Sequence, residues 1–131
     1  MAISVPDVGE NLVLEMIVNK TAAQNLVLKL YSSNTTPAET DTAGTYTEAT
    51  FTGYSAITLT GASWGAASGG SIAYAQQTFT CSGAGSQDIY GYFVIQTTSG
   101  TLLYSERGTG VPFTITTVGD NVKVTPTITA S

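Results

Sequence analysis

The sequence predicts an all-β protein, a single-domain antiparallel β-sandwich or jelly-roll-like barrel with about eight or nine strands. Short runs of apolar and β-branched residues recur along the chain, and Gly, Pro, Asn and Ser separate them at intervals of roughly 8 to 12 residues. No segment predicts a helix without ambiguity. The chain has 131 residues, of which 42% are hydrophobic, enough for one domain with its own core.

The first ten residues contain Pro6, Asp7 and Gly9 and few core-forming side chains. We therefore expect an N-terminal arm at residues 1–10 and a β-sandwich domain at residues 11–131. Such an arm would be able to extend and add a strand to a neighbouring molecule. In residues 11–19 the spacing of the apolar side chains fits a helix or a strand, and their β-branched residues favour a strand.

Residues 25–32 have the clearest strand pattern in the first half. Leu26, Leu28 and Leu30 alternate with more polar neighbours, which is typical of a half-buried strand. The short connection at residues 21–24 indicates an antiparallel pair. A loop is expected at residues 33–44, and two short strands at residues 46–50 and 55–60.

The next segments are a loop and a strand. Residues 61–70 are rich in Gly and Ser around Trp64, which predicts a loop. Residues 71–81 predict a strand whose alternation changes phase near Gln76 and Gln77, and this change indicates a β-bulge.

The strongest local signal is a β-hairpin. Residues 88–97 and 101–106 are apolar, β-rich runs, and a Thr-Ser-Gly turn separates them. Further strands are expected at residues 111–116 and 122–129. Pro126 in the last run indicates an edge strand or a strand end, because proline donates no ladder hydrogen bond.

Charge excludes two classes of partner. Charged residues make up 10% of the chain and the net charge is −5, and the four basic residues are scattered in the sequence. Phosphate backbones and anionic membranes attract clustered Lys and Arg, so we expect neither nucleic-acid nor membrane binding. A surface of hydroxyl groups is cheaper to desolvate than a charged one, and it favours large protein contacts. The basic residues are Lys20, Lys29, Arg107 and Lys123.

The single cysteine, Cys81, is expected to be a small buried hydrophobe on a strand rather than a reactive thiol. The first residues show no secretory signal pattern, and no apolar run is long enough to cross a bilayer. We therefore expect assembly in a reducing cytoplasm.

The residue types predict no catalytic, cofactor-binding or metal-binding site. The chain has no histidine, so the commonest general base and zinc ligand is missing. Glu39, Asp41 and Glu48 would be able to supply oxygen ligands to calcium, but their spacing matches no known loop, and a solvated loop is the favoured interpretation. Asp88 and Glu106 flank the predicted hairpin as a carboxylate pair, for which solubility is favoured over glycoside hydrolysis.

The aromatic residues leave three interpretations open. Trp64 lies in a Gly-rich loop, with three tyrosines nearby in the sequence. Exposed rings of this kind stack on sugars in carbohydrate-binding modules, and Tyr and Trp are also enriched at protein contacts. Most strand aromatics belong to the core. The three tyrosines are Tyr46, Tyr54 and Tyr74.

Several motifs resemble a family of small structural proteins of tailed bacteriophages. In the second half they are residues 89–94 (IYGYFV), 99–106 (SGTLLYSE), 112–115 (PFTI), Gly119-Asp120, 122–126 (VKVTP) and 128–129. In the first half they are residues 30–34 (LYSSN), Thr36-Pro37 and Asp41. The resemblance implies a β-rich capsid decoration, or cement, protein that clusters as trimers on the outside of the head. The family supplies no functional residues that map onto this chain.

These observations lead to one expectation of function and two alternatives. We expect a non-enzymatic virion protein that decorates or cements the capsid shell through contacts with the major capsid protein or another virion protein. It is expected to be a homo-oligomer without cofactors or metals, assembled in the host cytoplasm. The alternatives are a tail, neck or fibre component, and a carbohydrate- or receptor-binding β-sandwich module.

Overall fold

The computed structural model describes residues 3–130 and confirms the predicted all-β class: antiparallel strands, a single α-helix and two 3₁₀ turns form a sandwich-like fold. The strands are β1 (Ile3–Ser4), β2 (Leu26–Tyr31), β3 (Ile57–Leu59), β4 (Ser71–Ala73), β5 (Gln77–Thr80), β6 (Gln87–Ile89), β7 (Gly91–Gln96), β8 (Leu102–Arg107), β9 (Phe113–Ile115), β10 (Asn121–Val124) and β11 (Thr127–Thr129). The helix is α1 (Asp7–Ile17), and the 3₁₀ turns are η1 (Ala43–Thr45) and η2 (Gly61–Ser63).

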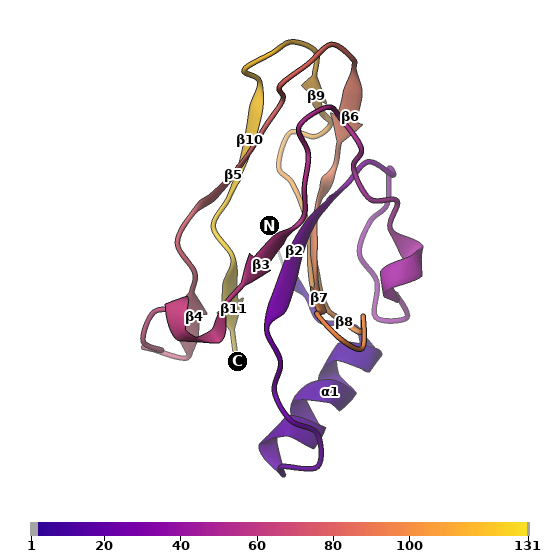
Figure 1. Ribbon diagram of the computed structural model, residues 1–131. Helices are drawn as coiled ribbons and strands as arrows, with labels where there is room; N and C mark the ends of the chain where they lie inside the picture. The colour runs from indigo at the N-terminus through magenta and orange to yellow at the C-terminus, as the bar shows by residue number, and fades with distance from the viewer. Residues whose placement is uncertain (1–2, 131) are drawn as a thin grey trace.

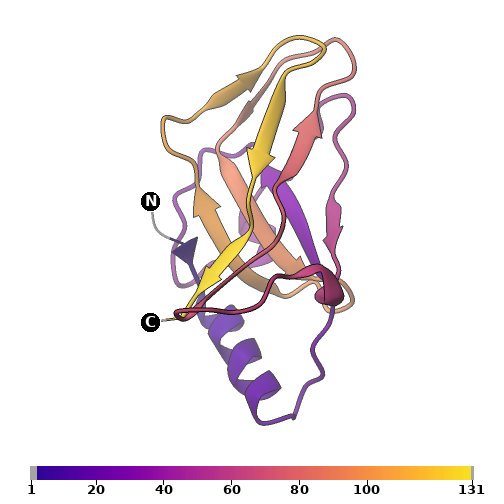
Figure 2. The ribbon, with the colours of Figure 1, turned by 90° about the vertical axis from the view of Figure 1, so that its left-hand side faces the viewer.

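Two layers of unequal width form the sandwich. The wider layer has five strands in the order β1-β8-β7-β2-β3. The narrower layer is a two-stranded ribbon, in which β5 pairs with β10 and β4 with β11. Figures 1 and 2 show this ribbon lying across the wider sheet, with α1 below one end of the sandwich.

The second half of the chain forms two nested ribbons. In the inner ribbon β7 pairs with β8, and the same two chain segments pair again as β6 with β9. This confirms the predicted hairpin. The outer ribbon of β4, β5, β10 and β11 encloses the inner one in the sequence, a nesting typical of jelly-roll-like folds.

The outer ribbon contains the predicted irregularity. Val124 lies opposite Gln77, and Thr127 lies opposite Ala73. Between these two pairs, residues 125–126 of one strand therefore face residues 74–76 of the other, two residues against three. This extra residue is the β-bulge that the change of phase predicts. Pro126 separates β10 from β11, which confirms it as a strand end.

The strand predicted at residues 11–19 is wrong, because this segment belongs to helix α1. Pro6 directly precedes the helix, and acidic residues in its first turn complement its dipole. Leu12 is buried, and a Cβ at Gly9 would collide with the carbonyl oxygen of Leu103. Packing against β8 therefore overrides the weak strand preference of the β-branched residues.

The predicted division into an arm at residues 1–10 and a domain at residues 11–131 is corrected as well. The boundary falls inside α1. Residues Ile3 and Ser4 pair with Glu106 and Ser105 at the edge of the wider sheet, so this segment adds a strand to its own domain. Residues 1 and 2 of the expected arm lie outside the described residues.

The strand predicted at residues 46–50 is also wrong. Only Glu48 makes an isolated bridge, to Tyr31, and the turn η1 precedes it. The segment is held by its side chains instead: the ring of Tyr46 stacks on Phe93, with the centroids 5.2 Å apart. The strand predicted at residues 55–60 is present but shorter, as β3.

Both faces of the wider sheet are buried, which gives two cores. The inner face, toward the ribbon, carries the larger core, which includes Leu30, Val94 and Tyr104. On the outer face the loop after β2 covers a smaller cluster, called the outer aromatic cluster, in which the rings of Tyr31, Tyr46 and Phe93 pack with the aliphatic Leu102.

Candidate functional site

The unequal layers leave one side of the sandwich open. A ribbon of two strands covers only part of a sheet of five, since neighbouring strands lie about 4.8 Å apart. Between the ribbon and β8 lies a groove of about 420 Å³, within the usual size range of ligand sites. Its lining comprises Leu30, Ile89, Gly91, Tyr92, Glu106, Gly108, Thr109, Val111, Phe113 and residues 121–125.

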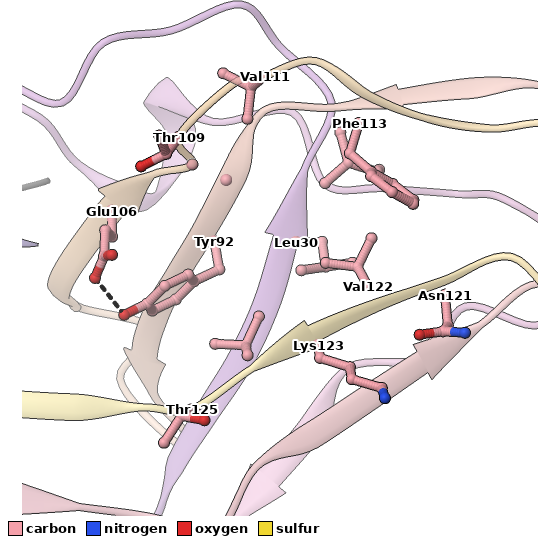
Figure 3. Close-up of a pocket in the computed structure, with 14 residues that line it drawn as sticks. Leu30, Tyr92, Glu106, Thr109, Val111, Phe113, Asn121, Val122, Lys123 and Thr125 are labelled. Carbon is pink, nitrogen blue, oxygen red and sulfur yellow. Dashed lines mark hydrogen bonds between the residues drawn. The ribbon is translucent and has the colours of Figure 1, made fainter.

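A carboxylate and a tyrosine form the polar end of the groove. The hydroxyl of Tyr92 donates a hydrogen bond to Glu106 Oε2 over 2.8 Å (Figure 3). Burial, the neighbouring Tyr104 and the Glu106 carboxylate together raise the pKa of Tyr92 above its ordinary value, so its hydroxyl stays protonated and is the donor at neutral pH.

No cation compensates Glu106 among the described residues. Lys20 pairs with Glu15 and Lys29 with Glu48. The basic residues near the groove are turned elsewhere. Arg107 donates to the carbonyl of Thr35 and to Asn34 and lies over the ring of Tyr90, while Lys123 points away from Glu106 in Figure 3.

Apolar side chains form the remainder of the groove. Leu30 and Val124 are buried at its floor, whereas Phe113 is 47% exposed. Figure 3 places Val111 and Phe113 above Val122 across the open space. A polar end beside an apolar floor suits a ligand that carries one donor group on an otherwise apolar or extended body.

The strand that borders the groove has a free edge. Among residues 3–130, β10 pairs only with β5, and β11 only with β4. The amide of Cys81 donates to Asp120 O, that of Tyr74 to Pro126 O, and that of Ala130 to Gly70 O, each over 2.8 Å. Antiparallel pairing alternates, so residues 120, 122, 124, 126, 128 and 130 face the ribbon partner. The backbone N–H and C=O groups of the odd-numbered residues from 121 to 129 therefore point to the other edge. Within residues 3–130 no backbone–backbone hydrogen bond reaches these groups.

Helix α1 presents a second candidate surface. Four large apolar residues in its second half and at the C-cap position that follows it are exposed, with fractions from 37% to 73%. Behind the helix lies a second hollow of about 320 Å³, lined almost wholly by apolar side chains that include Met16, Trp64 and Tyr104. The four exposed residues, called the α1 apolar face from here on, are Val13, Leu14, Ile17 and Val18.

The structure does not join the predicted calcium ligands into a metal site. Asp41 accepts hydrogen bonds from Tyr46 and the amide of Ala38, and Glu48 pairs with Lys29. The side chain of Glu39 is exposed. Within residues 3–130 no group of three Asp, Glu, His or Cys side chains is placed to hold a metal ion.

The predicted carboxylate pair is divided between two places. Asp88 accepts a hydrogen bond from Thr114 over 2.6 Å on the ribbon of β6 and β9, and it is not among the groove residues. Glu106 lines the groove. The two carboxylates thus have separate partners, and Glu106 is the only acidic side chain among the described residues that line the groove.

The four aromatic residues named from the sequence do not form one platform. Trp64 packs edge-on against Tyr74, and Tyr54 stacks on Phe79 in the larger core. Tyr46 belongs to the outer aromatic cluster. Cys81 is buried, as expected for a core residue.

Comparison with protein-family models finds no match, and comparison with curated proteins finds no significant similarity. Within the part of the chain that the structure describes, no helix is both long and apolar enough to cross a membrane. The resemblance to phage structural proteins therefore stays a prediction.

Sequence reasoning missed the groove and the α1 apolar face. The groove unites residues from four separate segments of the chain, which only the pairing of the strands brings together. Helix α1 itself had a signal in the sequence, the helical spacing of Leu12 and Met16, but the β-branched residues of the same segment favoured a strand.

Proposed function

We propose that this protein is a non-enzymatic structural component that packs against another protein within an assembly, and that the assembly is a phage particle whose capsid it decorates or cements. The observation that carries the proposal is the α1 apolar face. Ile17 and Val18 are 73% and 71% exposed, beside Leu14 at 61%. Soluble monomers seldom expose several large apolar side chains side by side, and such patches mark contact surfaces.

The energetics favour a protein partner for this helix. Full burial of one Val, Leu or Ile side chain contributes about 1.5–3 kcal/mol. The four side chains of the α1 apolar face together supply a strong anchor. The low charge of the chain, 10%, reduces the desolvation penalty at the rim of the contact.

The virion part of the proposal depends on the resemblance of the hairpin and C-terminal motifs to tailed-phage structural proteins. A tail, neck or fibre position in the same particle is the main alternative. Copy number separates the two, because a shell protein is present in hundreds of copies and a tail protein in far fewer.

The first experiment measures the abundance of the protein in purified particles by mass spectrometry, relative to the most abundant shell protein. A simple ratio to the shell subunit supports decoration. A few to a few dozen copies would move the protein to the tail or neck, and its absence from particles would overturn the virion proposal.

A matched pair of variants tests the α1 apolar face. Ile17→Glu places a charge in the proposed contact and is expected to lower incorporation into particles at least about tenfold. Val118→Glu is the control, because Val118 is a similarly exposed apolar residue (68%) that lies outside α1. Equal incorporation of both variants would exclude this face as the contact.

A further inference from the structure

The open side of the sandwich has the features of a site for an added strand. The free edge of β10 carries unpaired backbone donors and acceptors at residues 121 and 123, and the groove lies directly beside this edge. Sheets with such an edge bind extended peptides through main-chain hydrogen bonds, and alternate side chains of the peptide enter neighbouring pockets.

Pro126 leaves this edge intact. Its carbonyl accepts from the amide of Tyr74, so the position where proline lacks an N–H group faces β4 and not the open edge. The bulge likewise adds its extra residue on the opposite strand, between Ala73 and Gln77. The outward alternation therefore continues without a break along β10 and β11.

An added strand would point its inward side chains at Glu106. Val122 and Val124 show the direction, because both pack toward the inner face of the wider sheet. A new strand beside β10 would direct its corresponding side chains into the groove, where Tyr92 and Glu106 form the polar end. A partly buried carboxylate without a cation favours a Lys or Arg side chain there.

The charges argue against a second copy of this chain as the occupant. Lys20, Lys29 and Arg107 each have a partner in their own chain, and Lys123 lies on the edge strand itself, directed away from Glu106. The chain carries no other Lys or Arg, so a second copy would have to give up one of these contacts to supply the basic side chain, and a different protein is the favoured source.

We propose that the open side of the sandwich binds an extended segment of a partner protein, which pairs with the free edge of β10 and places a lysine or arginine side chain against Glu106. This inference rests on the proposed function, because it names the chemistry of the partner in the assembly.

A peptide panel tests the site with the protein alone in solution. The probe is a capped seven-residue peptide that alternates Thr and Val and carries Lys at its centre. Its two counterparts carry norleucine or Glu at that position. The Lys peptide is expected to bind about tenfold more tightly than the norleucine peptide, and the Glu peptide most weakly, as measured by NMR titration. Equal affinity for all three peptides, or no binding, would overturn the proposal.

Amide exchange locates the contact. With the Lys peptide bound, the amides of Asn121 and Lys123 are expected to exchange at least about tenfold more slowly, because they gain partners. The amides of Val122 and Val124 already face β5 and should change little. A preference for Lys without protection at residues 121 and 123 would contradict strand addition.

Two substitutions, each with a matched control, separate the effect of the Glu106 charge from that of the free β10 edge. Glu106→Gln should abolish the preference for Lys over norleucine, whereas the control Glu39→Gln, at an exposed loop carboxylate, should retain it. Lys123→Pro removes one outward amide and should abolish binding of all peptides. Lys123→Ala, which keeps that amide, should bind normally, and thermal unfolding of each variant confirms that it is folded.

The particle assay distinguishes failure of this inference from failure of the proposed function. If Ile17→Glu blocks incorporation while Lys123→Pro has no effect, the structural role stands and the groove proposal fails. If the peptides bind as expected but particles lack the protein, the groove stands and the virion proposal fails. Glycan binding that Phe113→Ala abolishes, without protection at residues 121 and 123, would replace the peptide with a sugar.

Discussion

The two faces of the wider sheet each contain a tyrosine hydrogen-bonded to a carboxylate, and their surroundings differ. On the outer face Tyr46 donates to Asp41 over 2.6 Å, and its hydroxyl lies 2.8 Å from the Ser105 hydroxyl. The same Asp41 oxygen accepts from the amide of Ala38. On the inner face the Glu106 carboxylate accepts from Tyr92 and borders an open groove.

This comparison separates a structural polar pair from a candidate binding group. The Asp41 pair is buried, and partners within the chain satisfy it, so its cost of desolvation is offset locally. The Glu106 carboxylate keeps hydrogen-bonding capacity on its open side. The chemistry of the two pairs is the same, and only the environment assigns their roles.

Among single substitutions, the largest expected effect is on the free energy of unfolding. Asp41→Ala removes the acceptor from the Tyr46 hydroxyl and the Ala38 amide and is expected to lower the free energy of unfolding by about 2–3 kcal/mol. Glu106→Ala should cost less than about 1 kcal/mol, because water in the groove can solvate Tyr92. Urea unfolding of both variants measures the difference. Equal losses would mean that Glu106 is as structural as Asp41.

A second effect, alkaline instability, is set by pH and not by a substitution. Burial, followed by the nearby Asp41 and Glu106 charges, raises the pKa of Tyr31 to about 12 in the folded protein, whereas Arg107 lowers it. Burial also raises the pKa of Tyr46 and Tyr92. The unfolded chain loses these protons near pH 10. The stability that these protonated tyrosines contribute is therefore complete below pH 10. It is lost as the pH rises toward the pKa of each tyrosine in the folded protein.

The expected slope is about 1.4 kcal/mol per pH unit for each such tyrosine between the two pKa values. Chemical unfolding at a series of pH values from 9 to 12 measures it, and absorbance at 295 nm follows ionisation of the tyrosines. Stability that stays constant to pH 12 would show that these rings are more solvated than the structure indicates.

The smallest expected effect compares the two hydroxyl groups. Tyr46→Phe leaves Asp41 and Ser105 with one partner fewer in a buried site and should cost about 1–2 kcal/mol. Tyr92→Phe should cost about 0.5 kcal/mol and free Glu106 for other donors, which would tighten binding of the Lys peptide. A larger loss of stability for Tyr92→Phe than for Tyr46→Phe would reverse the assignment of the two pairs.

The sequence predicts those elements whose pattern is local. The alternation of Leu26, Leu28 and Leu30 predicts β2, and the two runs around the Thr-Ser-Gly turn predict the hairpin of β7 and β8. Helix α1 was mistaken for a strand because its burial depends on contacts of Gly9 and Leu12 with β8, which lies far away in the chain.

The candidate site depends on long-range pairing still more strongly. Glu106 was considered together with Asp88 from the sequence, and a solubility role was favoured for both. Glu106 faces the groove beside β10 because the wider sheet has more strands than the ribbon that covers it. No local sequence pattern encodes this difference in strand number. The free edge of β10 cannot be predicted from the sequence either, because it depends on which strands remain without a pairing partner in the folded sheet.

The pairing of β1 with β8 has a consequence for how the molecule is made. Ile3 and Ser4 lie opposite Glu106 and Ser105, about a hundred residues further along the chain. During synthesis, α1 and β1 leave the ribosome long before their docking strand exists. Contacts so distant in sequence form slowly, so we expect this N-terminal segment to be among the last parts to settle. Until then its apolar helix is exposed to chaperones and to neighbouring nascent chains.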